Sequence, residues 1–437
     1  MSIASVLVKH SSQAACFVCP SSKVLDFTSR AGASPRGVVL TSSLGSDFVA
    51  LEDEWSTRMF HNAARMTLMD GGKRFLAWDW KSVAAFVLGR HGIRVPMNSP
   101  LVDLKLVESV TATRLECPRS VGEFGTRLKS VLTSDGWGRF QEVYRKVYVP
   151  LSASVVPAME AAGVLCEDRI HAHYDIAGQD NGRMLCHKAF ERGYNPHSLG
   201  ADEKSLFKPL ALDHVFLSFD FSGMEVMMLA WLSGDKALSS MCESGDMYRS
   251  VYEEITKTSC DSDEKRSMCK SFLLPLFYGM GFKAMSERLG LPEEVCAKLG
   301  ARVRSSFQEA WGFVERAQCE AESCGYVVDR FGKVRSLPDR HYRARNFAVQ
   351  SPASVFCMAA LIRLFESLNG LGQILYNVHD GYVASVPRDR VRDALLAGRD
   401  ALESECDLFP GLSIRVSCSA GRRLSEMRSL SVPRNKA

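Results

Sequence analysis

Residues 215–235 read VFLSFDFSGMEVMMLAWLSGD and combine the signals of a strand, a turn and a helix. The run begins with apolar residues typical of a buried strand, and this strand ends at the carboxylate of Asp220. Glu225 follows five residues later and opens a helical apolar pattern that stops at Gly234. Side chains at the exit of a rigid strand can reach a cleft, so both acids are candidate site residues. Two solvated surface acids are the alternative.

A second stretch places two cations along one face of a predicted helix. Arg266, Lys270, Leu274 and Tyr278 are spaced four apart, and Gly279 follows. Four-residue spacing aligns side chains on one helix face, where arginine and lysine one turn apart can bind the phosphates of a nucleotide. A solvated, salt-bridged helix face is the alternative, but such a face has no need for the closing tyrosine and glycine.

A third stretch, ILYNVHDGYVASV at residues 374–386, contains two β-type runs joined at His379, Asp380 and Gly381. Asp-Gly between two such runs predicts a tight hairpin with Asp380 at its tip. A plain turn without chemistry is the alternative. Taken with the first stretch, the hairpin provides a second carboxylate at the end of a strand.

The three stretches, in this order, resemble the motifs of family A DNA polymerases, which comprise the bacterial polymerase I group and its bacteriophage relatives. The first stretch, DFSGME followed by LSGD, is similar to the family's DYSQIELR, which also ends in LSGD. The cationic helix is similar to the family's R-x3-K-x3-F/Y-x3-Y-G, and HDG in the third stretch is similar to its VHDE. The resemblance covers residues 166–425, and a chance match of all three is remote. The chain departs from the family pattern at four positions. Met227 stands where the family has arginine, Leu274 where it has an aromatic residue, Pro275 where it has glycine, and Gly381 where it has a second acid. Proline inside the cationic helix predicts a bend at its centre.

The resemblance implies a template-directed DNA polymerase that adds dNTPs to a primer 3′-OH by two-metal-ion phosphoryl transfer. Asp220 and Asp380 would hold two Mg²⁺, for which Mn²⁺ can substitute, together with the backbone carbonyl of Phe221. Lys270 would be the catalytic acid that protonates the pyrophosphate, and Glu225 a steric gate against the ribose 2′-OH. The implied nucleotide-binding residues are Arg266, Lys270, Leu274, Tyr278, Glu225, Phe221 and His379.

DNA contacts are implied by two further similarities. Arg183, in RIHAHY followed by NGRM, matches an arginine in the family's RVHxxY and TGRL pattern that contacts the primer end. Asn346 and Gln350 match an N-x3-Q pattern that touches the template–primer minor groove, whose acceptors are nearly sequence-independent. Arg343 and Arg345 lie just before this pattern and are further DNA-binding candidates. A capping role for Asn346 at the start of a helix is the alternative.

The resemblance also implies the fold class, an α+β right-hand polymerase with palm, fingers and a reduced thumb. We assign residues 166–437 to palm and fingers, with the fingers at about 236–325. Residues 116–165 are assigned to reduced thumb or connector helices, because apolar residues recur there at helical spacing in 140–146 and 151–163.

Residues 1–115 weakly resemble the 3′–5′ exonuclease domain that precedes the polymerase domain in the family. Strands are expected at residues 37–40 and 73–78, followed by a helix at 81–90. Exonuclease chemistry needs clustered carboxylates, but residues 41–43 are Thr-Ser-Ser where acids are expected, and Asp103 is the one retained candidate. We therefore predict a degenerate exonuclease-like α/β domain without proofreading. An unrelated α/β domain is the alternative.

The 437 residues carry a net charge of +4, which permits nucleic-acid binding without arguing for it. No apolar run approaches the ~18 residues of a membrane span, so no membrane partner is predicted. The 14 cysteines are scattered, and Cys186, His187 and His197 have no standard zinc spacing. We predict reduced thiols in the cytoplasm of a bacterial or phage-infected cell, in preference to an organelle.

The predicted partners are primer–template DNA and dNTPs, and the predicted state is a monomer. The reduced thumb adds the hypothesis of a processivity or replisome partner. Two alternative functions stay open. One is a single-subunit RNA-polymerase-like enzyme, against which Glu225 and the LSGD ending argue. The other is a non-catalytic nucleic-acid-binding relative, against which the retention of both aspartates argues.

Overall fold

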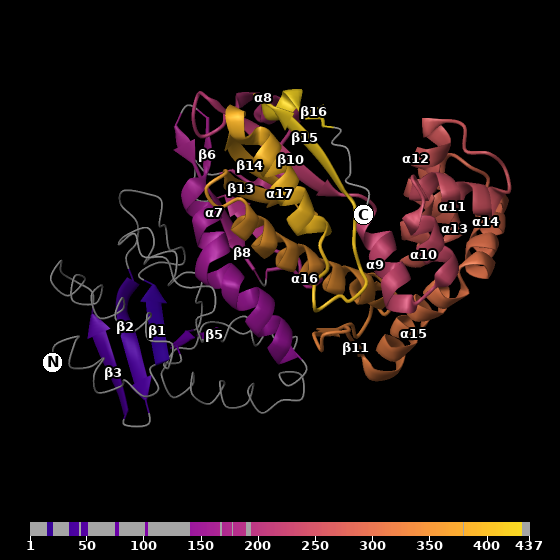
Figure 1. Ribbon diagram of the computed structural model, residues 1–437. Helices are drawn as coiled ribbons and strands as arrows, with labels where there is room; N and C mark the ends of the chain where they lie inside the picture. Colours follow the sequence, from indigo (N-terminus) through magenta and orange to yellow (C-terminus); the bar gives the residue numbers. More distant parts are fainter. Residues whose placement is uncertain are drawn as a thin grey trace. The chain divides into compact units, whose positions relative to one another are not determined.

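The computed structural model divides into two compact units, each formed from separate parts of the chain. The first contains Met1–Asp220, Val355–Leu408 and Arg415–Ala437, and the second contains Phe221–Ser354 and Phe409–Ile414. The structure describes residues 15–20, 35–42, 45–50, 75–77 and 101–103, and residues 140–430 except 167, 177, 189–193 and 379. Helices and strands carry the labels of Figure 1. The predicted domain boundaries differ from these units and stay predictions.

The N-terminal part of the first unit contains a five-stranded sheet, described by its backbone. Its strands are β1 (Ala15–Pro20), β2 (Pro35–Ser42), β3 (Gly45–Ala50), β4 (Phe75–Ala77) and β5 (Leu101–Asp103). In the order β3-β2-β1-β4-β5, β1 pairs antiparallel with β2 and parallel with β4. The two expected strands coincide with β2 and β4, and Asp103 ends β5. The helix expected at 81–90 lies outside the described residues, and the exonuclease-like assignment stays a prediction.

The segment from residue 140 to residue 162 is helical, as predicted. Wide π-type turns interrupt it: η2 (Tyr144–Tyr148) and η3 (Leu151–Val155) precede α7 (Val156–Ala162). Its aromatic side chains Phe140, Tyr144 and Tyr148 are each 1% exposed, so the segment belongs to the core of the first unit. Its assignment to thumb or connector stays a prediction.

A second five-stranded sheet of the first unit carries the two predicted catalytic aspartates. Its order is β13-β14-β10-β15-β16, with β10 at His214–Phe221, β13 at Gln373–Val378, β14 at Gly381–Pro387, β15 at Val416–Gly421 and β16 at Arg428–Ser429. β13 and β14 form the predicted hairpin, and β14 pairs antiparallel with β10 so that Asp220 lies opposite Gly381. The first and third motifs therefore occupy neighbouring strands of one sheet.

Helices that pack against this sheet include α17 (Val391–Glu403), the C-terminal half of α16 (Arg343–Ser367) and α7, which contacts β13. Phe219 of β10 is fully buried, and a Cβ added at Gly398 of α17 would lie 2.5 Å from its ring. Glycine at this position therefore permits the close approach of helix and strand. The Tyr382 hydroxyl of β14 donates a 2.7 Å hydrogen bond to the carbonyl of Cys357, which ties β14 to α16.

Among the described residues, α16 is the one helix long and apolar enough to span a membrane. In its most apolar window, 94% is buried inside the fold. Polar residues interrupt the apolar runs of α16, so the mean hydropathy of this window is high although the window contains no unbroken apolar run. A helix that is buried all round is typical of a protein core.

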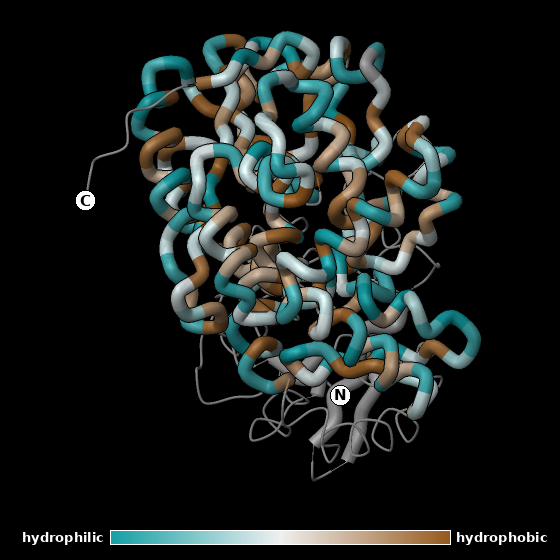
Figure 2. The backbone as a smooth tube through the Cα atoms, turned by 90° about the vertical axis from the view of Figure 1, so that its right-hand side faces the viewer, coloured by the Kyte–Doolittle hydropathy of each residue, from teal (hydrophilic) through white to brown (hydrophobic). Residues whose placement is uncertain are grey.

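The second unit is mainly helical and contains the predicted fingers segment (Figure 1). Its helices are α9 (Met224–Ser233), α10 (Lys236–Glu243), α11 (Met247–Thr256), α12 (Asp263–Phe277), α13 (Phe282–Leu289), α14 (Glu293–Ser306) and α15 (Gln308–Cys324). Side-chain oxygens of Asp235, Asp246 and Ser262 accept backbone N–H groups at the starts of α10, α11 and α12. Hydrophilic and hydrophobic residues alternate along the helical chain (Figure 2), as expected for helices with one buried face.

The hairpin of β11 (Tyr326–Val328) and β12 (Val334–Ser336) follows α15 and is held by the buried carboxylate of Asp329. Its Oδ1 accepts hydrogen bonds from the backbone N–H groups of Phe331 and Lys333 at 2.9 and 2.8 Å. Its Oδ2 accepts one from Ser351 Oγ of α16 at 2.7 Å. Burial raises the pKa of Asp329, although these hydrogen bonds oppose the shift.

Asp329→Ala is expected to lower the free energy of unfolding by about 3 kcal/mol, because three donors lose their acceptor. Asp329→Asn keeps a carbonyl oxygen for the two backbone donors and removes a charge that burial disfavours. We therefore expect it to cost less than about 1 kcal/mol. Urea denaturation of both variants measures the difference, and equal losses would contradict this explanation.

Candidate active site

The two aspartates of the first unit lie at the same end of the sheet, on neighbouring strands. Asp220 is exposed near the end of β10 and lies opposite Gly381, while Asp380 immediately precedes Gly381 in the hairpin turn. A Cβ built at Gly381 would lie 3.1 Å from Asp220 Oδ1. Any side chain at position 381 would therefore enter the space beside the Asp220 carboxylate.

This pair of carboxylates has the chemistry of a divalent-metal site that substrate completes. A cation such as Mg²⁺ keeps several waters and is usually bound by one or two carboxylates plus substrate phosphates. Across the described ranges, no three histidine, cysteine, aspartate or glutamate side chains gather in a way that could hold a metal ion. The zinc arrangement of Cys186, His187 and His197 is therefore not formed. The cysteines whose side chains are described form no disulfides with one another.

Glu225 is the centre of a hydrogen-bonded cluster in the second unit. It lies in the first turn of α9, two residues after Gly223, whose φ of +70° turns the chain into the helix. Its Oε2 accepts a 2.6 Å hydrogen bond from the Tyr278 hydroxyl at the end of α12. Its Oε1 accepts a 2.9 Å hydrogen bond from Gln350 Nε2 of α16. Three predicted site residues from three helices therefore meet at one carboxylate.

α12 presents the cationic residues in the predicted order. Arg266 is half-buried, and Lys270, one turn later, is exposed. Pro275 lies in the last turn of α12, and the helix runs on to Phe277. The proline thus lies near the end of the helix and not at its centre, and the bend that it would cause stays a prediction. There Met280 N–H donates to the Pro275 carbonyl at 2.9 Å.

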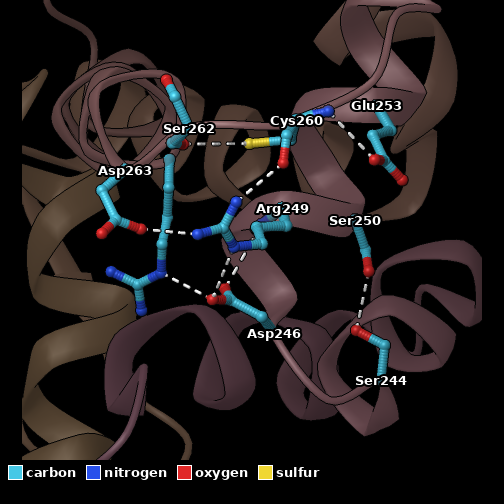
Figure 3. A network of polar contacts seen from close by, with 9 residues as sticks. Ser244, Asp246, Arg249, Ser250, Glu253, Cys260, Ser262 and Asp263 are labelled. Carbon is cyan, nitrogen blue, oxygen red and sulfur yellow. Dashed lines mark hydrogen bonds and ion pairs between the residues drawn. The ribbon is translucent and has the colours of Figure 1, made fainter.

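A polar network surrounds Asp246, which Figure 3 shows together with Arg249, Cys260 and Asp263. Arg266 joins this network, because its Nε donates to Asp246 Oδ2 at 2.6 Å. Arg249 extends the network, because its Nη2 donates to Asp263 Oδ1 at 2.5 Å and its Nη1 to the Cys260 carbonyl at 2.7 Å. Burial would raise the pKa of Asp246, but hydrogen bonds from Arg266 and Arg249 bring it below its ordinary value. Its stabilising contribution is therefore present above the ordinary pKa and is lost as pH falls through the lowered pKa.

Tyr248 of α11 lies beside Arg266, with 5.6 Å between the guanidinium carbon and the ring centre. Burial, with smaller contributions from Cys269 and Glu225, raises the pKa of Tyr248 to about 12, so its hydroxyl is protonated at neutral pH. The motifs do not reveal Asp246 or Tyr248. An aspartate before a helix is an ordinary cap, and a tyrosine in a helical pattern is an ordinary core residue.

The predicted DNA contacts of the second unit lie on the first turns of α16. Arg343 begins α16 and Asn346 lies three residues inside it, which corrects the alternative that Asn346 is the helix cap. Arg345 is buried, where its Nε donates to Gln318 Oε1 at 2.5 Å and its guanidinium carbon lies 5.5 Å from the centre of the Trp311 ring. The guanidinium thus helps to pack α16 on α15. DNA contact by these side chains stays a prediction.

The remaining predicted site residues are spread over both units. Arg183 is half-buried in the first unit, and its backbone N–H donates to Asn181 Oδ1 at 3.2 Å. The side chain of Phe221 is buried, and that of Leu274 is half-buried on α12. His379 lies outside the described residues. The roles given to these residues stay predictions.

Comparisons with known proteins agree with the motifs. The family model for DNA polymerase family A matches residues 142–426, about two thirds of the chain. "DNA polymerase I, thermostable" of Thermus filiformis is 28% identical over 220 residues, covering 46% of this chain and 26% of the relative. The DNA polymerase of Mycobacterium phage D29 is 29% identical over 236 residues, covering 51% of this chain and 37% of the relative. The chain thus spans about a quarter of the length of the Thermus relative.

Among solved structures, the chain resembles the POL domain of Pol1 from M. smegmatis, determined in complex with DNA primer-template and dNTP. The TM-score is 0.72 at 14% sequence identity, and the alignment covers 97% of this chain and 98% of that chain. At this identity the likeness demonstrates the fold, which mixes helices and strands as the sequence analysis predicted.

Proposed function

Because the chain belongs to DNA polymerase family A, we propose that it is a DNA-directed DNA polymerase that adds dNTPs to the 3′-OH of a DNA primer. The observation that carries the proposal is the β10–β14 pairing, in which Asp220 lies opposite the glycine that follows Asp380. Phosphoryl transfer requires positioned charge more than covalent chemistry, and this sheet end provides two carboxylates for it. The substrates bound by the mycobacterial structural relative support the same substrate class.

Asp220, Asp380 and the backbone carbonyl of Phe221 are the groups that would hold two Mg²⁺. Bound there, the two Mg²⁺ would lower the pKa of the primer 3′-OH and neutralise charge on the triphosphate. The residues themselves contribute oxygen ligands on a rigid strand pair. Glycine at position 381 lets the two strands lie close together there, because a Cβ would lie 3.1 Å from Asp220 Oδ1 and 3.3 Å from the Phe219 carbonyl oxygen.

The nucleotide-binding side chains of this proposal come from the second unit. Arg266 and Lys270 lie one turn apart on α12, a spacing at which both can bind one triphosphate. Lys270 would also give a proton to the leaving pyrophosphate. Glu225, with one oxygen bonded by Tyr278 and the other by Gln350, is the group that would exclude the ribose 2′-OH.

Primer extension by the full chain tests the proposal, with Mg²⁺ and either dNTPs or rNTPs on a primed DNA template. We expect extension with dNTPs. Preferential use of rNTPs would instead favour the RNA-polymerase-like alternative. Binding of primed duplex without extension by either nucleotide would favour the non-catalytic relative.

We propose that the chain does not proofread, because residues 41–43 lack the acids that exonuclease chemistry needs. A 3′-mismatched, labelled primer incubated with Mg²⁺ and no nucleotides is expected to keep its length. Shortening of the primer would contradict the proposed absence of exonuclease activity. If the shortening persisted in Asp103→Ala, the assignment of Asp103 to a degenerate exonuclease site would also be wrong.

The predicted processivity partner is a separate proposal, which follows from the small number of residues available for a thumb. Extension in the presence of a trap that captures released enzyme measures how many nucleotides are added in one encounter. We expect short products from the chain alone. Long products without any addition would reject the need for a partner.

A further inference from the structure

The guanidinium of Arg266 has one occupied edge and one open edge. Its Nε donates to Asp246 Oδ2 at 2.6 Å, while Nη1 and Nη2 make no hydrogen bond to any residue in the described parts of the chain. The side chain of Arg266 is 38% exposed, so the open edge can reach solvent. A guanidinium carries five donors in a rigid fork, and its two Nη groups can bind phosphate oxygens as a pair.

The carboxylate that holds Arg266 is itself held in place. Asp246 caps α11, where its Oδ1 accepts a 3.3 Å hydrogen bond from the backbone N–H of Arg249. The Nε of Arg249 lies 3.5 Å from Asp246 Oδ2. Arg249 is in turn bonded to Asp263 and to the carbonyl of Cys260 (Figure 3). Asp246 therefore presents a fixed carboxylate to α12, and not one on a freely rotating side chain.

We propose that Asp246 is a positioning residue: it holds Arg266 through Nε and so directs the Nη edge toward the phosphates of the incoming nucleotide. The inference rests on the proposed function. A long, flexible arginine loses rotamer freedom when it binds a phosphate, and the bond to Asp246 restricts that freedom before the nucleotide arrives. The ring of Tyr248, 5.6 Å from the guanidinium carbon, restricts it further.

The same ion pair has an opposite consequence if it competes with the phosphates. In that case Asp246 would keep Arg266 away from the nucleotide, and removing the carboxylate would strengthen nucleotide binding. Positioning predicts weaker nucleotide binding after the same change. The bonding pattern favours positioning, because Asp246 uses the Nε donor and leaves the paired Nη donors available.

Asp246→Asn separates the two cases, because asparagine caps a helix as well as aspartate but lacks the charge that holds Arg266. We expect the dissociation constant of dATP, titrated into the protein without DNA, to rise about tenfold, as expected when a charge-assisted contact is lost. The KM for dNTPs in primer extension is expected to rise by a similar factor, with the KM for primer–template unchanged. Unchanged or tighter dATP binding would overturn the proposal.

Asp263→Asn is the matched control. Asp263 belongs to the same network through Arg249, but its side chain is 87% exposed and its ion pair is made with Arg249 and not with Arg266. We expect dATP binding by this variant to equal that of the unaltered chain. A tenfold loss of dATP affinity in Asp263→Asn as well would mean that the stability of the whole network, and not Asp246 specifically, controls nucleotide binding.

A second background tests whether Asp246 acts through the guanidinium. Arg266→Lys keeps the positive charge but has no Nε donor, so Asp246→Asn is expected to change dATP binding less than about twofold in that background. Equal effects in both backgrounds would overturn the positioning role. If the unaltered chain failed to extend primers but Asp246→Asn still weakened dATP binding, the positioning role would stand and the polymerase function would be rejected. If the chain extended primers and Asp246→Asn left the KM for dNTPs unchanged, the polymerase function would stand and the positioning role would be rejected.

Discussion

Asp220→Ala and Asp380→Ala are each expected to lower the rate of primer extension at least about 10³-fold. The two carboxylates occupy neighbouring strands at one end of the sheet, and across the described ranges no further acid joins them as a third ligand. Either substitution would therefore leave one carboxylate to hold the metal ions. The measurement is single-nucleotide incorporation under single-turnover conditions, with saturating dNTP and primed template.

The control for this pair is Asp213→Ala, an exposed acid just before β10 in the same unit. It changes the same charge without touching the end of the sheet that carries the candidate metal site, so we expect unaltered incorporation. Thermal unfolding of all three variants checks that the sheet is intact. Incorporation by Asp220→Ala or Asp380→Ala within tenfold of the unaltered chain would reject the metal site.

The strand that carries Asp220 and the hairpin that carries Asp380 are the parts of the site that the sequence specifies best. A buried strand ending in an acid and an Asp-Gly turn between β runs are both local signals, and local patterns decide where strands begin and end. The pairing of β10 with β14 is not local, because the paired residues lie more than 160 positions apart. The family resemblance, and not the pattern, led us to expect the two acids together.

The contacts of the helical unit were much less predictable. Glu225, Tyr278 and Gln350 could each be named from motifs, but their hydrogen bonds depend on how three helices pack. Arg345 is a DNA-binding candidate because it lies beside Asn346, and its burial against Trp311 and Gln318 of α15 is not evident from the sequence. Whether a cation is buried or available is decided by residues distant in sequence, and helical periodicity identifies only the face on which it lies.

Glu225→Ala is expected to raise the use of rNTPs relative to dNTPs about 10²-fold, measured as the ratio of kcat/KM values. In the structure each carboxylate oxygen already accepts a hydrogen bond, from Tyr278 at 2.6 Å and from Gln350 at 2.9 Å. The side chain is therefore fixed in one position. A 2′-OH that approaches it meets an obstacle that cannot rotate away without losing both bonds, and alanine removes that obstacle.

Glu225→Gln distinguishes size from charge as the basis of this discrimination. Glutamine has nearly the same volume, and its amide oxygen can still accept from Tyr278 or Gln350, so a steric gate predicts selectivity close to that of the unaltered chain. Tyr278→Phe removes one of the two bonds that fix the carboxylate and is expected to loosen discrimination less than Glu225→Ala does. If Glu225→Gln accepted rNTPs as readily as Glu225→Ala, repulsion by the charge would replace steric exclusion. If Glu225→Ala left the ratio unchanged, Glu225 would have no part in sugar selection, and its bonds to α12 and α16 would serve only to hold those helices together.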